Sequence, residues 1–355
     1  MKKLGIICVV LLLASGFAFS QAQPAGFSNT VYMDIGTANV DGTGMIPYNN
    51  DVKVNGFIDH FTANIKTNKV DVSGDITWKL LNNFDMKASY ISHNFNGTMT
   101  PFTGFYIGFG TNLDWQVGPK PFSGPAYTAY TMPYYAGLDV LGNSVGYVKN
   151  YFAQKSIAFI YSYENDFSIG MGLNSDNTKS VGLLINLPKT ATLGFAYNGT
   201  FNKTDNNFYF GSELFLDALN IDLWLNIAQK NYTTFGSRFK FYTKANAFYL
   251  APEFSVTSWK QDHKGMSMYI ALLSEMSLSD EVLAGLNSSW GLGSDPDTKN
   301  DALDSGIRFN INPHLVWNLN KSHRLAIGIN LMNISWQDDR SDFYWNIPIS
   351  WTVKF

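Results

Sequence analysis

Large apolar residues alternate with small or polar residues along most of the chain. The clearest example is the last segment, residues 343–355, which reads FYWNIPISWTVKF. Successive side chains of a β-strand point to opposite faces, so this segment predicts a strand with one apolar face and one mostly polar face. The apolar positions are Phe343, Trp345, Ile347, Ile349, Trp351, Val353 and Phe355.

The same period of two recurs upstream. In residues 219–228 every odd-numbered position is Leu or Ile, and residues 307–317 alternate likewise until Pro313 interrupts them. Counting backwards from Phe355 gives about thirteen predicted strands as far as Ser156. Further examples are residues 157–163, 167–173, 181–187 and 325–331.

The predicted connections alternate between short turns and longer polar loops. Transmembrane β-barrels have this layout, with the short turns on one rim and the longer loops on the other. The short turns are predicted at residues 82–83, 164–166, 188–190, 217–218, 244–245, 279–280 and 321–322, and the longer loops at 174–179, 198–207, 229–234, 259–265, 290–305 and 337–341.

The pattern is less regular before Ser156. Residues 23–51 contain one predicted strand, 27–36, and then a loop rich in Gly and Asn. Residues 101–151 are rich in Gly, Pro and Tyr and predict either two strands with long loops or a loop folded inward. We therefore predict an all-β, antiparallel up-and-down barrel of about 16 strands, within a range of roughly 14–18.

The N-terminal residues predict export. Met1-Lys2-Lys3 precede an apolar stretch, and Ser20-Gln21-Ala22 resembles a cleavage site, so residues 1–22 are predicted to be a signal peptide. Residues 23–355 then form a single barrel domain. The one cysteine, Cys8, lies in the leader, and the mature chain would carry no disulfide or thiolate site.

Composition narrows the function. Charged residues make up 15% of the chain and aromatic residues another 15%, and the formal net charge is −3. No basic cluster is present, so we expect no nucleic-acid partner. After residue 22 no apolar run reaches the roughly 18–20 residues of a membrane helix, which leaves a closed barrel as the structure that can span lipid.

The terminal Phe355 and the alternation together resemble the bacterial outer-membrane β-barrel proteins, and porins among them, over nearly all of residues 23–355. The resemblance implies an outer-membrane location, contact with membrane lipid, and reading of the C-terminal strand by the barrel assembly machinery. The sequence leaves open whether the barrel forms homo-oligomers.

Charged residues at the polar positions of the strands are the candidate site. A turn at Asp217-Ala218 sets Glu213 directly opposite Asp222, and two adjacent carboxylates repel unless a cation intervenes. The next strand supplies cations at its inward positions, Arg238 and Lys240. Arg or Lys facing lipid would cost about 2–4 kcal/mol at the midplane, so inward placement is expected.

Further inward charges follow along the chain. A turn at Lys244-Ala245 would set Phe241 beside Phe248 and bring Glu253 near Arg238. The lumen candidates are therefore Glu213, Asp222, Arg238, Lys240, Glu253, Glu275 and Arg308. Such residues form either a constriction that sets ion preference or pairs that only neutralise each other and stiffen the wall.

We predict a porin-like channel for passive diffusion of small hydrophilic solutes or ions. One alternative is an outer-membrane transporter of hydrophobic compounds, similar to the long-chain fatty-acid transporters, with residues 101–135 supplying an apolar pocket. Another is a structural or adhesive barrel that displays loops such as 291–305, and the sequence does not assign a role to the loop at 37–51. The five histidines have no metal-ligand spacing, so no enzyme, catalytic residue, metal or cofactor is expected.

Overall fold

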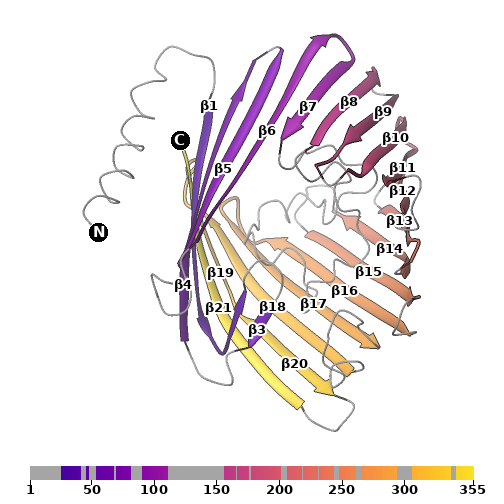
Figure 1. Ribbon diagram of the computed structural model, residues 1–355. Helices are drawn as coiled ribbons and strands as arrows, with labels where there is room; N and C mark the ends of the chain where they lie inside the picture. The colour runs from indigo at the N-terminus through magenta and orange to yellow at the C-terminus, as the bar shows by residue number, and fades with distance from the viewer. Residues whose placement is uncertain are drawn as a thin grey trace.

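The alternating segments pair into a closed antiparallel β-barrel (Figure 1). Among the described residues, no helix is long and apolar enough to cross a membrane. The predicted signal peptide lies outside the described residues and stays a prediction. The computed structural model describes residues 25–40, 45–47, 53–67, 69–80, 90–110, 156–164, 166–175, 177–200, 206–217, 219–230, 232–243, 248–260, 265–293, 306–336 and 341–355.

The strands are given in chain order. The first are β1 (Ala25–Gly36), a small hairpin of β2 (Ala38–Val40) and β3 (Met45–Pro47), β4 (Lys53–Lys66), β5 (Val70–Leu80), β6 (Tyr90–Phe102) and β7 (Phe105–Gly110). Next come β8 (Ser156–Tyr163), β9 (Phe167–Leu173), β10 (Lys179–Leu187), β11 (Ala191–Gly199), β12 (Asn207–Leu216), β13 (Leu219–Ala228) and β14 (Tyr232–Tyr242). The last are β15 (Phe248–Trp259), β16 (Met266–Ser277), β17 (Val282–Gly293), β18 (Gly306–Asn318), β19 (His323–Gly328), β20 (Asn330–Trp336) and β21 (Ser341–Lys354).

The sheet closes on itself because β1 pairs with both β21 and β4. Within the described residues, β19 and β20 form one spanning strand, so the barrel has 18 strands. The predicted count of about 16 was therefore low, although the observed 18 strands lie within the predicted range of 14–18. In the described part of the chain, five strands of the barrel, β1 and β4–β7, precede Ser156. The outward face of β6 places His93 and Gly97 between Ile91 and Met99, which hides the alternation.

Two prolines explain why β19 and β20 separate at Ile329. The pairings of β18 with β19 and with β20 keep one register, in which Pro313 lies opposite Ile329. The register of β21 likewise places Pro348 opposite Gly328. Proline has no N–H to donate to the ladder, so the bonding is interrupted here without a bulge.

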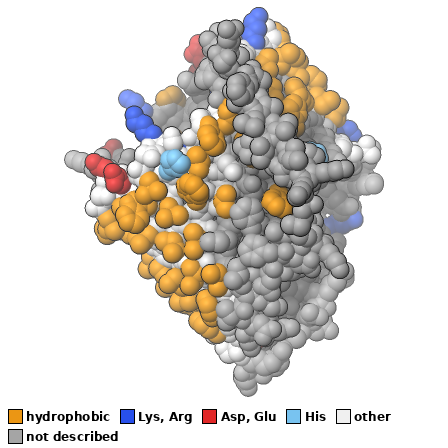
Figure 2. Space-filling view, turned by 90° about the vertical axis from the view of Figure 1, so that its left-hand side faces the viewer, with side chains coloured by type: hydrophobic (Ala, Val, Ile, Leu, Met, Phe, Trp, Pro, Cys, Tyr) orange, Lys and Arg blue, Asp and Glu red, His pale blue; other side chains and the backbone are white. Residues whose placement is uncertain are grey.

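The outward face of the barrel is apolar. Figure 2 shows hydrophobic side chains covering the described part of one face, with charged side chains toward its margins. In β14, for example, Phe235, Phe239 and Phe241 are exposed, whereas Arg238 and Lys240 between them are buried. A continuous apolar outer surface on a closed barrel is the arrangement that satisfies every backbone group inside lipid, and the fold is that of a transmembrane barrel.

The short connections share one rim. The short turns predicted between 164 and 322 each fall between consecutive strands. The start of β1 and the end of β21 lie on the same rim, where Phe355 N donates to Phe27 O at 2.9 Å. Two further short connections, at 67–69 and 103–104, were not predicted. The predicted turn at Asn82-Asn83 and the loops at 111–155 and 294–305 lie outside the described residues.

Candidate functional site

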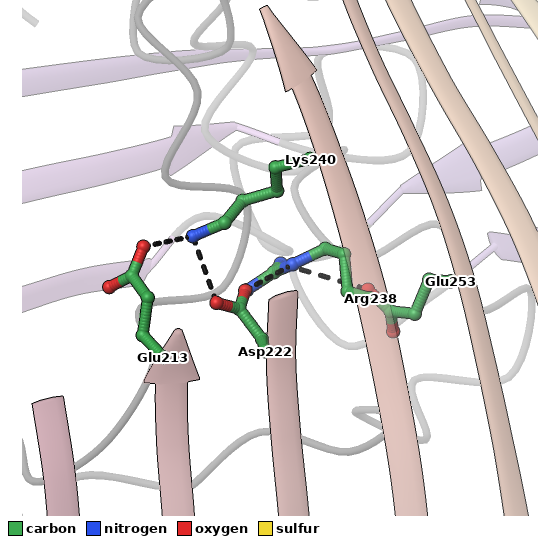
Figure 3. Close-up of polar contacts among 5 residues, drawn as sticks. All are labelled: Glu213, Asp222, Arg238, Lys240 and Glu253. Carbon is green, nitrogen blue, oxygen red and sulfur yellow. Dashed lines mark hydrogen bonds and ion pairs between the residues drawn. The ribbon is translucent and has the colours of Figure 1, made fainter. Parts of the chain in front are cut away.

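Five charged side chains from four consecutive strands meet on the inner wall (Figure 3). The pairing of β12 with β13 sets Glu213 directly opposite Asp222, as the turn at Asp217 predicts. The next pairing sets Asp222 opposite Arg238, which in turn lies opposite Glu253 on β15. We call this set the charged ladder: Glu213, Lys240, Asp222, Arg238 and Glu253.

Asp222 is the centre of the charged ladder. Its Oδ2 atom accepts hydrogen bonds from Arg238 Nε at 2.8 Å and lies 2.6 Å from Arg238 Nη2. Its Oδ1 atom lies 2.9 Å from Lys240 Nζ, which also contacts Glu213. Arg238 Nη1 reaches Glu253 Oε2 at 3.7 Å. The sequence predicts that Glu213 and Asp222 repel each other unless a cation lies between them. Lys240 is that cation.

Burial makes these contacts strong and leaves one end of the charged ladder accessible. The side chains of Lys240 and Asp222 are completely buried, and those of Arg238 and Glu253 are nearly so. The Glu213 side chain keeps 22% of its surface exposed. Buried charges need partners because desolvation is costly, and here each cation lies between two carboxylates.

The register of β14 with β15 differs from the prediction. Phe241 lies opposite Leu250, not Phe248, so the expected pairing was wrong by two residues. The shift of two preserves which side chains face inward, and it moves Glu253 from near Arg238 to directly opposite it. The connecting residues 244–247 lie outside the described part of the chain. The sequence does not determine how many residues this turn contains, and the register of the two strands depends on that number.

Glu275 lies inward on β16, as predicted, but outside the charged ladder. Its Oε1 atom is 3.5 Å from His314 Nε2 on β18, and both side chains are buried. Gly285 of β17 lies opposite both residues, and the absence of a side chain there lets them meet across it. An added Cβ at Gly285 would stand 2.1 Å from His314 Nε2. The alternation of β18 predicts that His314 faces inward. Its partner Glu275 can be recognised only when the pairings of β16 with β17 and of β17 with β18 are both known.

Arg308, the remaining candidate, is not brought to the charged ladder by the strand pairing. It lies on β18 opposite Gly291 of β17 and Ile334 of β20. The alternation of β18 puts it at an inward position, because Ile307 on one side and Phe309 on the other pair with outward residues of β17. Its side chain is outside the described part of the structure.

An apolar patch lies beside the charged ladder on the same wall. Trp224, two residues from Asp222 on β13, is buried against Ala196 and Tyr209. The indole covers Gly236 of the next strand, where an added Cβ would stand 2.2 Å from Trp224 Cζ2. Alternation predicts Trp224 inward, but the absence of a side chain at Gly236 gives it the space to lie along the wall.

Asparagines form a second polar feature of the inner wall. Strand pairing sets Asn287 opposite Asn312 and Asn330 opposite Asn346. The flanking pairs Ile311–Leu331 and His314–Gly328 put Asn312 opposite Asn330 as well. All four side chains are buried. The interior of β17–β21 is thus lined at this level by uncharged amides, in contrast to the charged ladder on β12–β15.

Comparison with solved structures finds the same barrel fold in outer-membrane proteins. OccK1 (OpdK) of Pseudomonas aeruginosa has 10% identical residues and a TM-score of 0.58, over 94% of this chain and 100% of that chain. OccK11 (OpdR) of the same organism has 9% identity and a TM-score of 0.58, over 93% and 96%. Acinetobacter baumannii OccAB4 has 10% identity and a TM-score of 0.57, over 94% and 99%.

The likeness is one of fold. No protein-family model and no curated protein sequence matches the chain. Across the part of the chain that the structure describes, no group of three or more His, Cys, Asp or Glu residues is arranged to hold a metal ion. The chemistry of the interior therefore depends on its own side chains, and above all on the charged ladder.

Proposed function

We propose that the protein is a porin-like channel through which small hydrophilic solutes or ions diffuse passively across a bacterial outer membrane. The charged ladder on the inner wall of a closed barrel carries this proposal. Ionised side chains are placed where they meet water or partners rather than lipid, and they form one side of a polar path. No turnover and no cofactor is required for such transport.

Barrel width supports an aqueous interior. Barrel diameter grows with strand number: barrels of about 8 strands are filled by their own side chains, whereas those of 16–18 strands leave a water-filled channel. This barrel has 18 strands in its described part. The inward positions of β17–β21 carry uncharged amides such as Asn312 and Asn346, so this part of the inner wall is polar although these side chains are themselves buried.

The solved structures support a location in the outer membrane, and the architecture they share suggests which rim faces the periplasm. One of them is described as the outer membrane protein OpdK of Pseudomonas aeruginosa, and another is OpdK with vanillate. By the same architecture, the rim with the short turns, the start of β1 and the end of β21 would face the periplasm. Recognition of the last strand, ending at Phe355, by the barrel assembly machinery belongs to the same proposal.

Reconstitution tests this function. Protein lacking residues 1–22, refolded in detergent and added to planar bilayers, is expected to give stepwise conductance, and liposomes containing it should swell in small sugars or salts. A refolded barrel that leaves both bilayers and liposomes impermeable would overturn the proposal. Saturable binding of fatty acid in that case would instead favour the hydrophobic-compound transporter.

A further inference from the structure

We propose that Glu213 gives this channel a preference for cations: inorganic cations and the ammonium groups of small organic solutes. The inference rests on the proposed channel function and names the class of solute that the charged ladder favours. It follows from three properties of the charged ladder: the order of its charges, the place where it meets the lumen, and the engagement of its two cations.

The charges alternate along the charged ladder, and both ends are acidic. The order of contacts is Glu213, Lys240, Asp222, Arg238 and Glu253. Three carboxylates against two cations leave one net negative charge when all five groups are ionised. Each cation lies between two carboxylates, whereas each terminal carboxylate contacts one cation of the set, so the excess charge lies toward the ends.

Only one of the two ends is accessible. The side chain of Glu253 is 3% exposed, whereas that of Glu213 is 22% exposed. Of the five side chains of the charged ladder, the one most accessible to a solute is therefore a carboxylate. Oxygen atoms of a partly hydrated carboxylate attract cations, and the attraction is stronger beside a low-dielectric protein wall than in bulk water.

The two cations of the charged ladder are poorly placed to receive anions. Lys240 Nζ is completely buried against Glu213 and Asp222. Arg238 directs Nε and Nη2 to Asp222 and Nη1 to Glu253. A solute carboxylate would have to displace one of these protein carboxylates, which would leave a buried charge without its partner. The two bases therefore neutralise part of the negative charge of the charged ladder without offering a site to anions, and the accessible acid sets the preference for cations.

Reversal potentials across a KCl gradient test the inference on single channels of the refolded protein. The wild type should pass K⁺ in preference to Cl⁻. Glu213→Gln keeps an oxygen that can accept from Lys240 and removes the accessible charge, so the permeability ratio of K⁺ to Cl⁻ should fall roughly twofold or more toward one. The matched control is Glu281→Gln, the same chemical change at an exposed position outside the strands.

The outcomes separate the two proposals. Conducting channels that prefer Cl⁻, or whose ratio is the same in wild type and Glu213→Gln, would overturn the role of Glu213 while leaving the channel function intact. A shift of equal size in Glu281→Gln would assign the preference to diffuse surface charge and also overturn it. Absence of any conductance from folded barrels would overturn the channel function itself and this inference with it.

Discussion

The side-chain amide of Asn312 donates a hydrogen bond to the carbonyl oxygen of Ile329 at 3.2 Å, at the place in the ladder where Pro313 has no backbone N–H to donate. Ile329 N donates to Pro313 O at 3.0 Å, so the two residues form a hydrogen-bonded pair of the ladder with one bond missing. An unsatisfied carbonyl at membrane depth is costly, and the neighbouring asparagine supplies the missing donor.

Replacing Asn312 by Ala should therefore destabilise the barrel. We expect a loss of about 1–3 kcal/mol in the free energy of unfolding, because the Ile329 carbonyl is left without its side-chain donor. The urea midpoint of the folded band on cold SDS gels measures this. Pro313→Val in the Asn312→Ala background restores a backbone N–H and should recover most of the loss. If the double variant is no more stable than Asn312→Ala, the account of this hydrogen bond is wrong.

Gly285 should resist substitution because Glu275 and His314 meet across it. The added methyl of Gly285→Ala would stand 2.1 Å from His314 Nε2 and force the buried ring to move. Overpacking of this kind costs about 1–3 kcal/mol, again measured by the urea midpoint. Gly26→Ala is the control, since nothing lies within 4 Å of the Cβ it would add. Adding His314→Ala to the Gly285→Ala variant should relieve most of the penalty. Equal stability of Gly285→Ala and Gly26→Ala would contradict the steric argument.

Asp222 should be the most sensitive member of the charged ladder. Asp222→Asn removes the charge that both Arg238 and Lys240 contact, and breaking such a buried pair costs about 3–5 kcal/mol. Asp217→Asn, at an exposed position next to β12, should change the midpoint little. Comparable midpoints for the two variants would show that the charged ladder contributes no more than a surface charge.

Lys240→Met should change ion selectivity in the opposite direction to Glu213→Gln. Removing this cation changes the net charge of the charged ladder from −1 to −2, so the preference for K⁺ over Cl⁻ should increase. The reversal potential in a KCl gradient measures it, with Lys321→Met on the exposed rim as the control. A decreased K⁺ preference in Lys240→Met would mean that the wall does not act through its summed charge.

The sequence predicts the inner and outer faces of the barrel well where strands are regular and turns are short. A two-residue turn fixes the register, so the meeting of Glu213 with Asp222 followed from sequence alone. The inward direction of Arg238, Lys240 and Glu275 could be predicted because their neighbours along the strand are large apolar residues that face outward. Charged side chains that face lipid are costly, so alternation is rarely broken in the membrane-spanning part of a strand.

Other features depend on register across longer connections, which alternation does not determine. The pairing of Phe241 with Leu250 was missed for this reason, and so was the contact of Glu275 with His314 two strands away. The strand count was low because the pattern is irregular before Ser156, where, for example, His93 lies outward on β6. Lipid-facing positions near a barrel rim tolerate such residues at small cost, and the sequence pattern is weakest there.

Cysteine accessibility tests the central claim, that Glu213 faces a water-filled path while its neighbours along β12 face lipid. The chain has one cysteine, Cys8, so protein beginning at residue 23 is a cysteine-free background. Glu213→Cys channels in a planar bilayer should lose conductance stepwise when a charged, membrane-impermeant thiol reagent is added. Ser212→Cys, one residue away on the outward face, should not respond. Silence of Glu213→Cys, or an equal response from Ser212→Cys, would contradict the account.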